Sequence, residues 1–308
     1  MTHPSTINTT TLKKPQPCIP FQKTQSTLSS PSKTMSPTLP SSSVLKDFSL
    51  ITAPTPLAGG QGQSFLCGTT VLKHIPPTPT EEAEWTSHTL SLLPPSAYFT
   101  IPTPILASTG SYVYENWTAT QFCPGTDHPV GHWEVLFSAA RHFHASLAGI
   151  PEPEFLKRTH PWARADRIAW GEESVAVVPA LAPLYEQLLS LRKEVGVVIA
   201  QLVHGDLSGN ILLSDSQPPV IIDFSPFFRC VDYAVAIAVV DGIADFGEGD
   251  EVLRASGLVW YGDRLGRHAV QMLVRALLFR VVAGVSLWVL CERWCRWRGG
   301  EPRRGWRS

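Results

Sequence analysis

The chain has 308 residues, 44% of them hydrophobic, which is enough for one two-lobed domain or two small domains around an apolar core. Residues 1–46 contain five Lys and no acid, residues 47–290 contain 14 basic and 24 acidic residues, and residues 291–308 contain six Arg and two Glu. The acidic body argues against nucleic acid as a partner, because phosphate contacts need clustered Lys and Arg.

Residues 1–48 are rich in Ser, Thr, Pro and Lys and show no hydrophobic periodicity. Such a segment cannot bury enough apolar surface to offset the entropy lost on ordering, so we expect a disordered tail. A transit peptide is the alternative, since the segment lacks acids, although it also lacks Arg and an amphipathic face. The six cysteines form no CxxC pair and no secretory hydrophobic segment precedes them, which favours a cytoplasmic location.

A Gly-rich turn at residues 57–65 contains Gly60 and Gly62 and leads into a short predicted strand. The next predicted strand ends in Lys73. Glycine lets backbone amides approach a ligand closely, so this turn is a candidate phosphate cradle. A plain hairpin turn is the alternative interpretation.

A predicted helix at residues 81–93 opens with three acids, Glu81, Glu82 and Glu84. Acids in a first helical turn favour the helix dipole, which explains all three without a function. The functional alternative is that one of them pairs with Lys73 and fixes its ammonium over nucleotide phosphates. The sequence does not decide which; Glu84 is our preference and Glu81 its rival.

Two further strands are predicted at residues 111–114 and 117–122, joined by a tight turn at Glu115 and Asn116. The run Cys123-Pro124-Gly125 then breaks the pattern and predicts a boundary between lobes. The expected organisation is a disordered tail (1–48), a nucleotide-binding N-lobe (49–124), a helical C-lobe (125–290) and a basic tail (291–308).

Apolar residues at helical spacing predict helices at residues 132–147, 181–191 and 233–243, the last with Asp232 as its N-cap. His142 and His144 lie two apart in the first of these helices and point to different faces, so we interpret them as surface or packing residues rather than metal ligands.

The last long apolar run, residues 269–290, has the length of a membrane span. Arg275 and Arg280 lie near its centre, where lipid would disfavour them, so we expect a packed helix and no membrane span. For the Arg-rich residues that follow we expect a solvated tail, with contact to an acidic membrane or a partner as the alternative.

The stretch at residues 202–226 carries Asp206, Asn210 and Asp223 at the polar ends of two short apolar runs. A hairpin with buried strands leaves its flanking loops exposed at one end, so these three side chains can converge there. Carboxylate and amide oxygens suit Mg²⁺, which retains substrate phosphates in its coordination shell. The stretch therefore predicts a site for a metal-bound phosphate.

Taken in order, a Gly-rich turn, a strand Lys, a helix Glu, HGDLSGNIL and then VIIDF resemble the aminoglycoside phosphotransferase branch of the protein-kinase-like fold, over about residues 55–290. The HGDLxGN form is typical of a poorly characterised branch of that family. The resemblance implies an α+β fold with two lobes, a small β-rich N-lobe and a mainly helical C-lobe. It also implies ATP and Mg²⁺ as cofactors and a small-molecule acceptor.

The resemblance assigns a role to each matching residue. Asp206 would be the catalytic carboxylate that orients or deprotonates the acceptor hydroxyl, and His204 would support the loop through hydrogen bonds. Asn210 and Asp223 would hold Mg²⁺. The residues expected to contact the nucleotide are Gly60, Gly62, Lys73, Glu84, and, around adenine, Phe122 and Cys123.

Two features depart from the family pattern. Asn210 follows Asp206 by four residues instead of five, with Gly209 placed to absorb the deletion, and Ser225-Pro226 replaces the glycine that normally follows Asp-Phe. Two functions therefore remain open. One is an ATP- and Mg²⁺-dependent phosphotransferase acting on a small-molecule hydroxyl, and the other is a degenerate kinase-like protein that binds a nucleotide or a protein partner without turnover.

The sequence does not reveal the acceptor or the oligomeric state. Residues 245–251 contain four acids, which would attract a cationic acceptor by long-range field; a solvated loop is the alternative.

Overall fold

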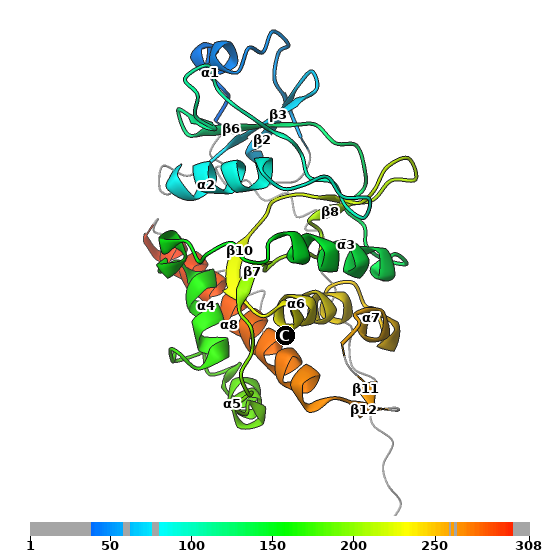
Figure 1. Ribbon diagram of the computed structural model, residues 1–308. Coiled ribbons are helices and arrows are strands. Elements are labelled where there is room, and N and C mark those ends of the chain that lie inside the picture. The colour runs from blue at the N-terminus through cyan, green and yellow to red at the C-terminus, as the bar shows by residue number, and fades with distance from the viewer. Residues whose placement is uncertain (1–37, 58–61, 76–79, 259, 262–263, 298–308) are drawn as a thin grey trace, which may run out of the picture.

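Short apolar runs separated by tight turns give the first part of the chain an antiparallel sheet, and longer runs at helical spacing give the rest a helical lobe. The computed structural model describes residues 38–297 apart from 58–61, 76–79, 259 and 262–263. Figure 1 shows the two lobes one above the other, with the sheet in the upper lobe. The expected α+β fold with a small β-rich lobe and a mainly helical lobe is confirmed.

The sheet of the small lobe has the strand order β1-β2-β3-β6-β4, and β5 also pairs with β6. Helix α2 (Thr80–Ser91) lies between this sheet and the large lobe (Figure 1). The strands are β1 (Thr55–Pro56), β2 (Ser64–Cys67), β3 (Thr70–His74), β4 (Pro104–Ile105), β5 (Val113–Tyr114) and β6 (Trp117–Gln121).

The predicted tight turn joins β5 to β6. Glu115 has φ 47° and Asn116 has φ 63°, so both residues of the two-residue loop adopt the left-handed conformation. This conformation matches the right-handed twist of the flanking strands, which is why such turns favour Asn.

The structure describes a helix inside the segment that the sequence predicts to be a disordered tail. Helix α1 (Ser42–Asp47) lies inside the segment expected to be a disordered tail, and the Ser41 side chain accepts a hydrogen bond from the Val44 N–H at its start. Val44 and Phe48 are buried in the core of the small lobe, together with Phe65. The two apolar residues are spaced one helical turn apart, so burial against the sheet outweighs the polar composition of their neighbours. The expected boundary at residue 48 is therefore wrong.

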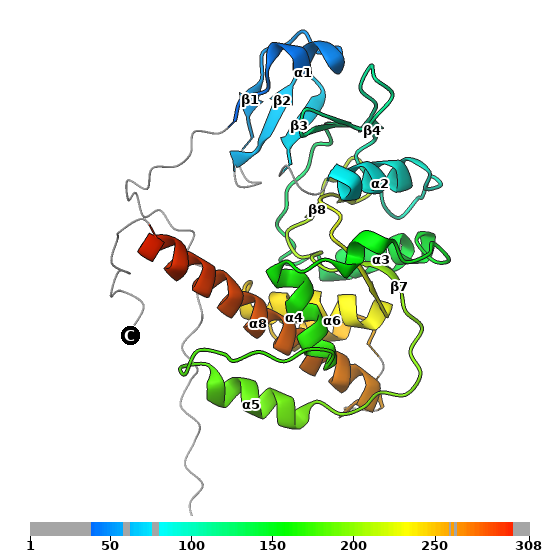
Figure 2. The same cartoon turned by 90° about the vertical axis from the view of Figure 1, so that its left-hand side faces the viewer.

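Helix α8 (Arg267–Trp297) crosses the large lobe, with α4 (Pro161–Trp170), α5 (Ala182–Leu191) and α6 (Val231–Ala244) packed against it (Figure 2). The sequence did not predict α4. The other elements of this lobe are α3 (Trp133–Ser146), α7 (Asp250–Ala255), a 3₁₀ turn (Glu154–Lys157) and the strands β7 (Gln201–His204), β8 (Ile211–Leu212), β9 (Val220–Ile221), β10 (Pro226–Arg229), β11 (Trp260–Tyr261) and β12 (Arg264–Leu265).

The start of α6 differs from the prediction that Asp232 caps it. Cys230 occupies the N-cap without a side-chain hydrogen bond, and Asp232 lies in the first turn. The Asp232 carboxylate is 3.0 Å from the His268 ring at the start of α8, so a contact between helices replaces the expected local cap.

The long C-terminal helix packs inside the large lobe, as the two arginines predicted. Arg275 is buried and donates to the Lys193 carbonyl oxygen at 2.9 Å and to the Gln271 side-chain oxygen at 3.1 Å. The helix continues to Trp297, past the expected lobe boundary at residue 290. Among the helices that the structure describes, none is long and apolar enough to cross a membrane.

The linker between the lobes lies directly on the β8–β9 hairpin. Thr126 exchanges backbone hydrogen bonds with Leu213, at 3.0 and 2.8 Å. A Cβ atom built on Gly125 would lie 2.8 Å from the Leu212 Cβ, so this position requires glycine. Val220, on the other strand of the hairpin, forms a parallel bridge with Thr100 of the small lobe.

Candidate active site

The loop after β7 rests on a buried histidine. His204 is fully buried, and its Nδ1 accepts the Asp206 backbone N–H at 3.2 Å while its Nε2 lies 3.1 Å from the Ile222 carbonyl oxygen. These partners assign the ring proton to Nε2. Burial lowers the pKa of His204, which favours this neutral form. The resemblance expected this supporting role for His204, and the geometry is compatible with it.

A second buried histidine supports the first. The His144 Nε2 on α3 accepts the His204 backbone N–H at 3.1 Å. Burial and the nearby His204 lower the pKa of His144 to about 3, so the ring is neutral and able to accept this bond. The interpretation of His144 as a packing residue therefore misses its contact with the loop, because α3 and β7 are far apart in the sequence.

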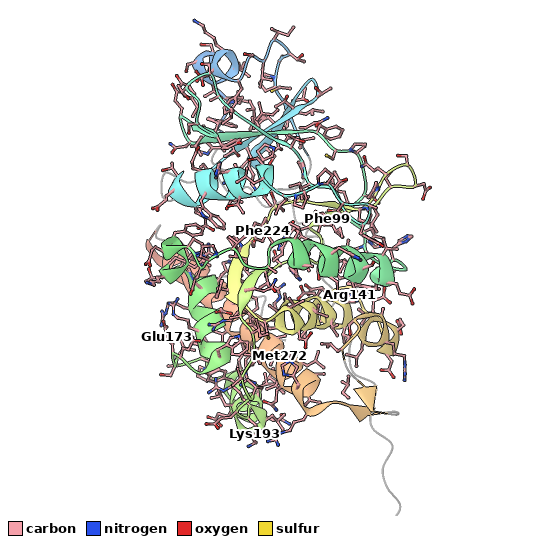
Figure 3. All side chains as sticks on the ribbon, viewed as in Figure 1. Phe99, Arg141, Glu173, Lys193, Phe224 and Met272 are labelled. Carbon is pink, nitrogen blue, oxygen red and sulfur yellow. The ribbon has the colours of Figure 1, made fainter. Side chains whose placement is uncertain are left out.

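Phe224 packs beside His204 at the junction of the lobes (Figure 3). Its ring centroid lies 5.4 Å from that of Phe143 and 5.6 Å from that of His204, both in edge-to-face arrangements. Phe224, the residue after Asp223, is thereby packed against His204, on which the loop after β7 rests.

The shortened loop folds back on itself. Asn210 Nδ2 donates to the Asp206 carbonyl oxygen at 2.6 Å and lies 3.3 Å from its carboxylate Oδ2. Gly209, with φ 83°, provides the left-handed turn that brings Asn210 back. Asp206 and Asn210 are therefore in contact even though Asn210 follows Asp206 by four positions instead of the usual five.

Asp223 lies at the same end of the β8–β9 hairpin as Asn210, because the Ile222 N–H donates to the Asn210 carbonyl oxygen at 3.0 Å. Asp223 has φ 47°, a conformation that is strained for a side chain other than glycine and that often occurs at functional sites. Lys73 Nζ, from β3 of the small lobe, lies 2.6 Å from Asp223 Oδ1. The lysine and aspartate singled out by the sequence are thus paired across the lobes.

The preferred partner of Lys73, Glu84, lies elsewhere. Its carboxylate accepts hydrogen bonds from the Ser111 hydroxyl at 2.7 Å and from the backbone N–H groups of Tyr112 and Val113 at 2.9 and 3.0 Å. The structure therefore contradicts the Lys73–Glu84 pair, because Glu84 satisfies backbone donors of the loop before β5.

The second acid of the helix connects the lobes instead. Glu82 forms an ion pair with Arg158, and the same guanidinium donates to the Pro226 carbonyl oxygen at 2.9 Å. Glu81, the rival candidate, lies beside Glu84 in a surface hollow at the start of α2.

The described end of the Gly-rich turn, residues 62–65, lies close to Lys73. Gly60 falls outside the described residues, whereas Gly62 has φ 73° and open space at its Cβ position. Ser64 pairs with Lys73 in the antiparallel β2–β3 ladder, so the turn that precedes Ser64 is at the lysine end of β3.

The residues expected near adenine lie on the linker after β6. The Phe122 N–H donates to the Thr69 carbonyl oxygen at 2.8 Å, and its side chain is 38% exposed. Cys123 is a half-buried free thiol whose pKa burial raises. These two residues precede the contact between the linker and the β8–β9 hairpin, so they border the junction of the lobes.

The catalytic candidate has a partner that the sequence did not suggest. Arg280 Nη2, from α8, lies 2.8 Å from Asp206 Oδ1. Its Nε also donates to Asp241 Oδ1 at 2.7 Å, and Asp241 is buried in α6. Only folding brings these three residues together, since 74 positions separate Asp206 from Arg280.

The donor set is suitable for magnesium. Among the residues that the structure describes, no group of three or more His, Cys, Asp or Glu could hold a metal. Mg²⁺ requires fewer protein ligands, because it binds through one or two carboxylates plus water and phosphates. Asp223 offers a carboxylate, and Asn210, with its amide nitrogen directed to Asp206, offers a carboxamide oxygen. The residues present therefore fit Mg²⁺ with a nucleotide.

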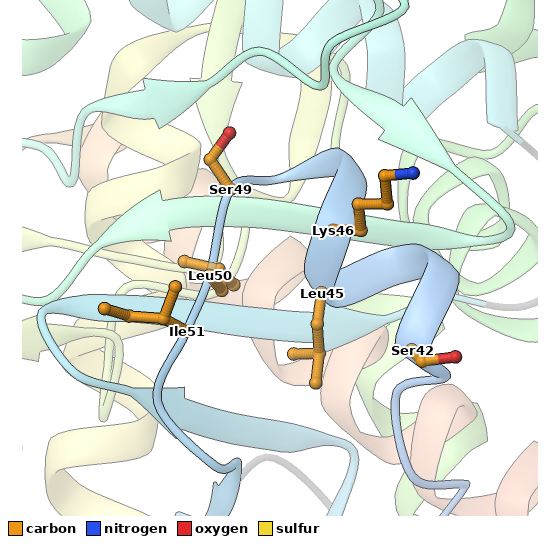
Figure 4. A pocket seen from close by; sticks show the side chains of 6 residues that line it. All are labelled: Ser42, Leu45, Lys46, Ser49, Leu50 and Ile51. Atoms are coloured by element: carbon orange, nitrogen blue, oxygen red, sulfur yellow. The ribbon is translucent and has the colours of Figure 1, made fainter.

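The hollow shown in Figure 4 is distant from these groups. It lies at the outer end of the small lobe, beside α1. Its lining contains no carboxylate and consists of Ser42, Leu45, Lys46, Ser49, Leu50 and Ile51. We assign it no part in the candidate active site.

No family model and no curated protein sequence matches the chain. Solved structures do match the chain. An aminoglycoside phosphotransferase from Alicyclobacillus acidocaldarius matches with a TM-score of 0.57 at 13% identity, over 88% of this chain and 90% of that chain. The chain has the aminoglycoside phosphotransferase fold.

Two further structures support this fold. The AMP complex of a spectinomycin phosphotransferase matches with a TM-score of 0.54 at 13% identity, over 82% of this chain and 90% of that chain. The choline kinase LicA from Streptococcus pneumoniae matches with a TM-score of 0.52 at 12% identity, over 84% and 90%. The resemblance expected from HGDLSGNIL and VIIDF is thus confirmed at the level of the aminoglycoside phosphotransferase fold.

Proposed function

We propose that the protein is an ATP- and Mg²⁺-dependent phosphotransferase that acts on a hydroxyl group of a small molecule in the cytoplasm. The main observation in support is the 2.6 Å pair between Lys73 and Asp223, which joins the lobes beside the Asp206–Asn210 contact. A cation on one lobe and acidic and amide groups on the other are what a nucleotide with a divalent metal needs. The fold, shared with small-molecule phosphotransferases, agrees with this function.

Each polar group has a defined task in this proposal. Lys73 moves from Asp223 to the nucleotide phosphates, because a bound nucleotide offers the ammonium a more highly charged partner. Asp223 and Asn210 would hold Mg²⁺, which would supply charge neutralisation at the phosphates. Gly62 and the linker residues Phe122 and Cys123 border the nucleotide.

Asp206 acts on the acceptor. Its carboxylate accepts a hydrogen bond from the acceptor hydroxyl, orients the oxygen toward the γ-phosphorus and takes up the proton. The transfer forms a bond between that oxygen and phosphorus and breaks the bond from phosphorus to the bridging oxygen of ADP. The chemistry depends mainly on positioning, so the buried support from His204 is part of the proposed function.

Thermal unfolding with and without ATP and Mg²⁺ tests nucleotide binding. A ligand that binds the native state raises the unfolding temperature, and Asp223→Ala should abolish the part of this shift that requires Mg²⁺. Asp215→Ala is a matched control, because Asp215 is an exposed carboxylate in the turn between β8 and β9. An absence of any shift for the wild type at saturating nucleotide would refute the proposal.

Turnover is tested by phosphate transfer to a panel of metabolites with hydroxyl groups. We expect Asp206→Asn to reduce kcat by about 100-fold or more while the nucleotide-induced thermal shift persists, because the lost group contributes general-base catalysis and orientation. An Asp206→Asn variant as active as the wild type would show that the assigned role is wrong.

Two observations favour the second candidate function, nucleotide or partner binding without turnover. The loop is one residue short, and Asp206 is already paired with Arg280. This alternative predicts a thermal shift with ATP and Mg²⁺ but no transfer to any acceptor and no release of phosphate.

A further inference from the structure

Arg280 joins a buried carboxylate to the catalytic candidate. Its Nε donates to Asp241 Oδ1 at 2.7 Å, and its Nη2 contacts both Asp241 Oδ2 and Asp206 Oδ1. The Asp241 side chain is 5% exposed and the Asp206 side chain 47% exposed. A single guanidinium therefore links the interior of the large lobe to the exposed loop.

The arginine has little freedom to move. Two contacts to one carboxylate fix the planar guanidinium in its own plane. The rings of Phe279 and Trp162 also lie beside it, with centroids 5.2 and 5.9 Å from its central carbon. Arg280 thus presents Nη2 to Asp206 from a fixed position.

The two oxygens of Asp206 have different neighbours. Oδ1 faces Arg280 at 2.8 Å, and Oδ2 faces the Asn210 amide at 3.3 Å. Contacts on both sides fix the plane of the carboxylate, although the residue is half exposed. The contact to Oδ1 comes from helix α8, outside the loop. It therefore does not depend on the number of residues between Asp206 and Asn210.

We propose that Arg280 is a positioning residue for Asp206 and supplies, from helix α8, the restraint that a loop one residue short lacks. Its catalytic consequence rests on the proposed phosphotransfer. The competing explanation is that Arg280 only neutralises the buried Asp241, in which case its contact with Asp206 has no effect on stability or rate.

A double-mutant cycle tests the contact without any enzymatic assay. The background variant is Asp241→Asn, which removes the buried charge that would otherwise dominate the effect of losing the arginine. Arg280→Gln and Asp206→Asn are then introduced singly and together, and the urea midpoint is measured for each protein. We expect the second substitution to shift the midpoint less when the first is present, whereas strictly additive shifts would overturn the proposal.

The rate test uses Mg²⁺ and ATP with water as the acceptor. Relative to Asp241→Asn alone, we expect Asp241→Asn with Arg280→Gln to lower kcat for phosphate release by about tenfold or more, with a KM for ATP changed by less than about twofold, because misplacement of Asp206 affects only the transition state. An unchanged kcat would overturn the proposal.

Arg275→Gln is the matched control for damage to helix α8. Arg275 is buried in the same helix and contacts Gln271 and the Lys193 carbonyl, so its loss should lower stability and leave kcat unchanged. An equal loss of kcat in this variant would assign the effect of Arg280 to general disruption and overturn the proposal.

The two assays separate the positioning role from the proposed function. If the wild type releases no phosphate from ATP and transfers none to any acceptor, the proposed phosphotransfer fails. The double-mutant cycle measured by urea unfolding then decides by itself whether Arg280 restrains Asp206.

Discussion

The two candidate site aspartates are held in different ways. Asp223 pairs with a lysine of the other lobe, and the two side chains are 44% and 37% exposed. Asp206 pairs with an arginine of its own lobe, which is anchored to the buried Asp241. An exposed ion pair contributes about 0–1 kcal/mol, whereas removing one partner of a buried pair costs about 3–5 kcal/mol. The Lys73–Asp223 pair is therefore expected to exchange easily, whereas the Arg280–Asp241 pair, which anchors the partner of Asp206, is costly to break.

The largest expected effect comes from breaking the buried Arg280–Asp241 pair. Arg280→Ala leaves the Asp241 carboxylate buried without its counter-ion, and we expect a loss of about 3–5 kcal/mol in the free energy of unfolding. Urea unfolding measures this loss. The double variant Asp241→Asn with Arg280→Gln should recover most of it, because two neutral amides can share hydrogen bonds. A loss below about 1 kcal/mol for Arg280→Ala would show that the pair resembles the exposed one.

The buried His144, which supports the loop that carries Asp206, should make the stability of the protein sensitive to acid. His144 has its folded pKa lowered to about 3 by burial, while an unfolded histidine titrates near 6.5. The unfolded state therefore binds more protons between these values. Stability is unaffected above this range, and it falls as the pH falls from about 6.5 toward 3, by at most about 1.4 kcal/mol per pH unit for this group.

Urea unfolding at several pH values, compared with His144→Gln, measures this slope. Gln can still accept the His204 N–H but cannot gain a proton, so its slope should be smaller. His142→Gln, on the same helix, is the control. Equal slopes for His144→Gln and the wild type would contradict the assignment.

A smaller effect is expected where the linker meets the hairpin that carries Asp223. Gly125→Ala would place a Cβ 2.8 Å from the Leu212 Cβ and 3.1 Å from the Leu213 carbonyl oxygen. We expect a loss of about 1–3 kcal/mol, since the backbone has to shift. Gly196→Ala is the matched control, because its Cβ position is open. If thermal unfolding finds the two variants equally stable, the linker is not held as described.

The smallest effect on stability should follow from breaking the exchangeable pair. Lys73→Met removes a half-exposed ion pair, so without nucleotide we expect a change of less than about 1 kcal/mol. The same variant should lose most of the thermal shift with ATP and Mg²⁺, because the phosphates lose their cation. A large loss of stability combined with an intact nucleotide shift would reverse the comparison between the two aspartates.

Local sequence predicted the features that depend on neighbouring residues. The run HGDLSGNIL followed by VIIDF indicated the fold and the convergence of Asp206, Asn210 and Asp223 at one end of a hairpin. The pair Glu115-Asn116 indicated the tight turn, because asparagine tolerates the left-handed conformation that such a turn needs.

Predictions failed where the local sequence did not distinguish between alternative partners or conformations. Three acids in one helical turn are equivalent in sequence, yet Glu84 binds backbone donors of a distant loop and Glu82 reaches Arg158 on the other lobe. The polar composition before residue 49 concealed α1, because burial of Val44 and Phe48 depends on a sheet formed later in the chain.

The sequence by itself determined the order of the lobes, the fold and the identity of the polar groups at their junction, because these follow from patterns within a few residues. Only the tertiary structure decided the partners of those groups. Lys73 meets Asp223 across 150 positions and Arg280 meets Asp206 across 74, and both contacts depend on how separate elements pack. Pairing between distant charges is set by packing and burial, which no local pattern contains.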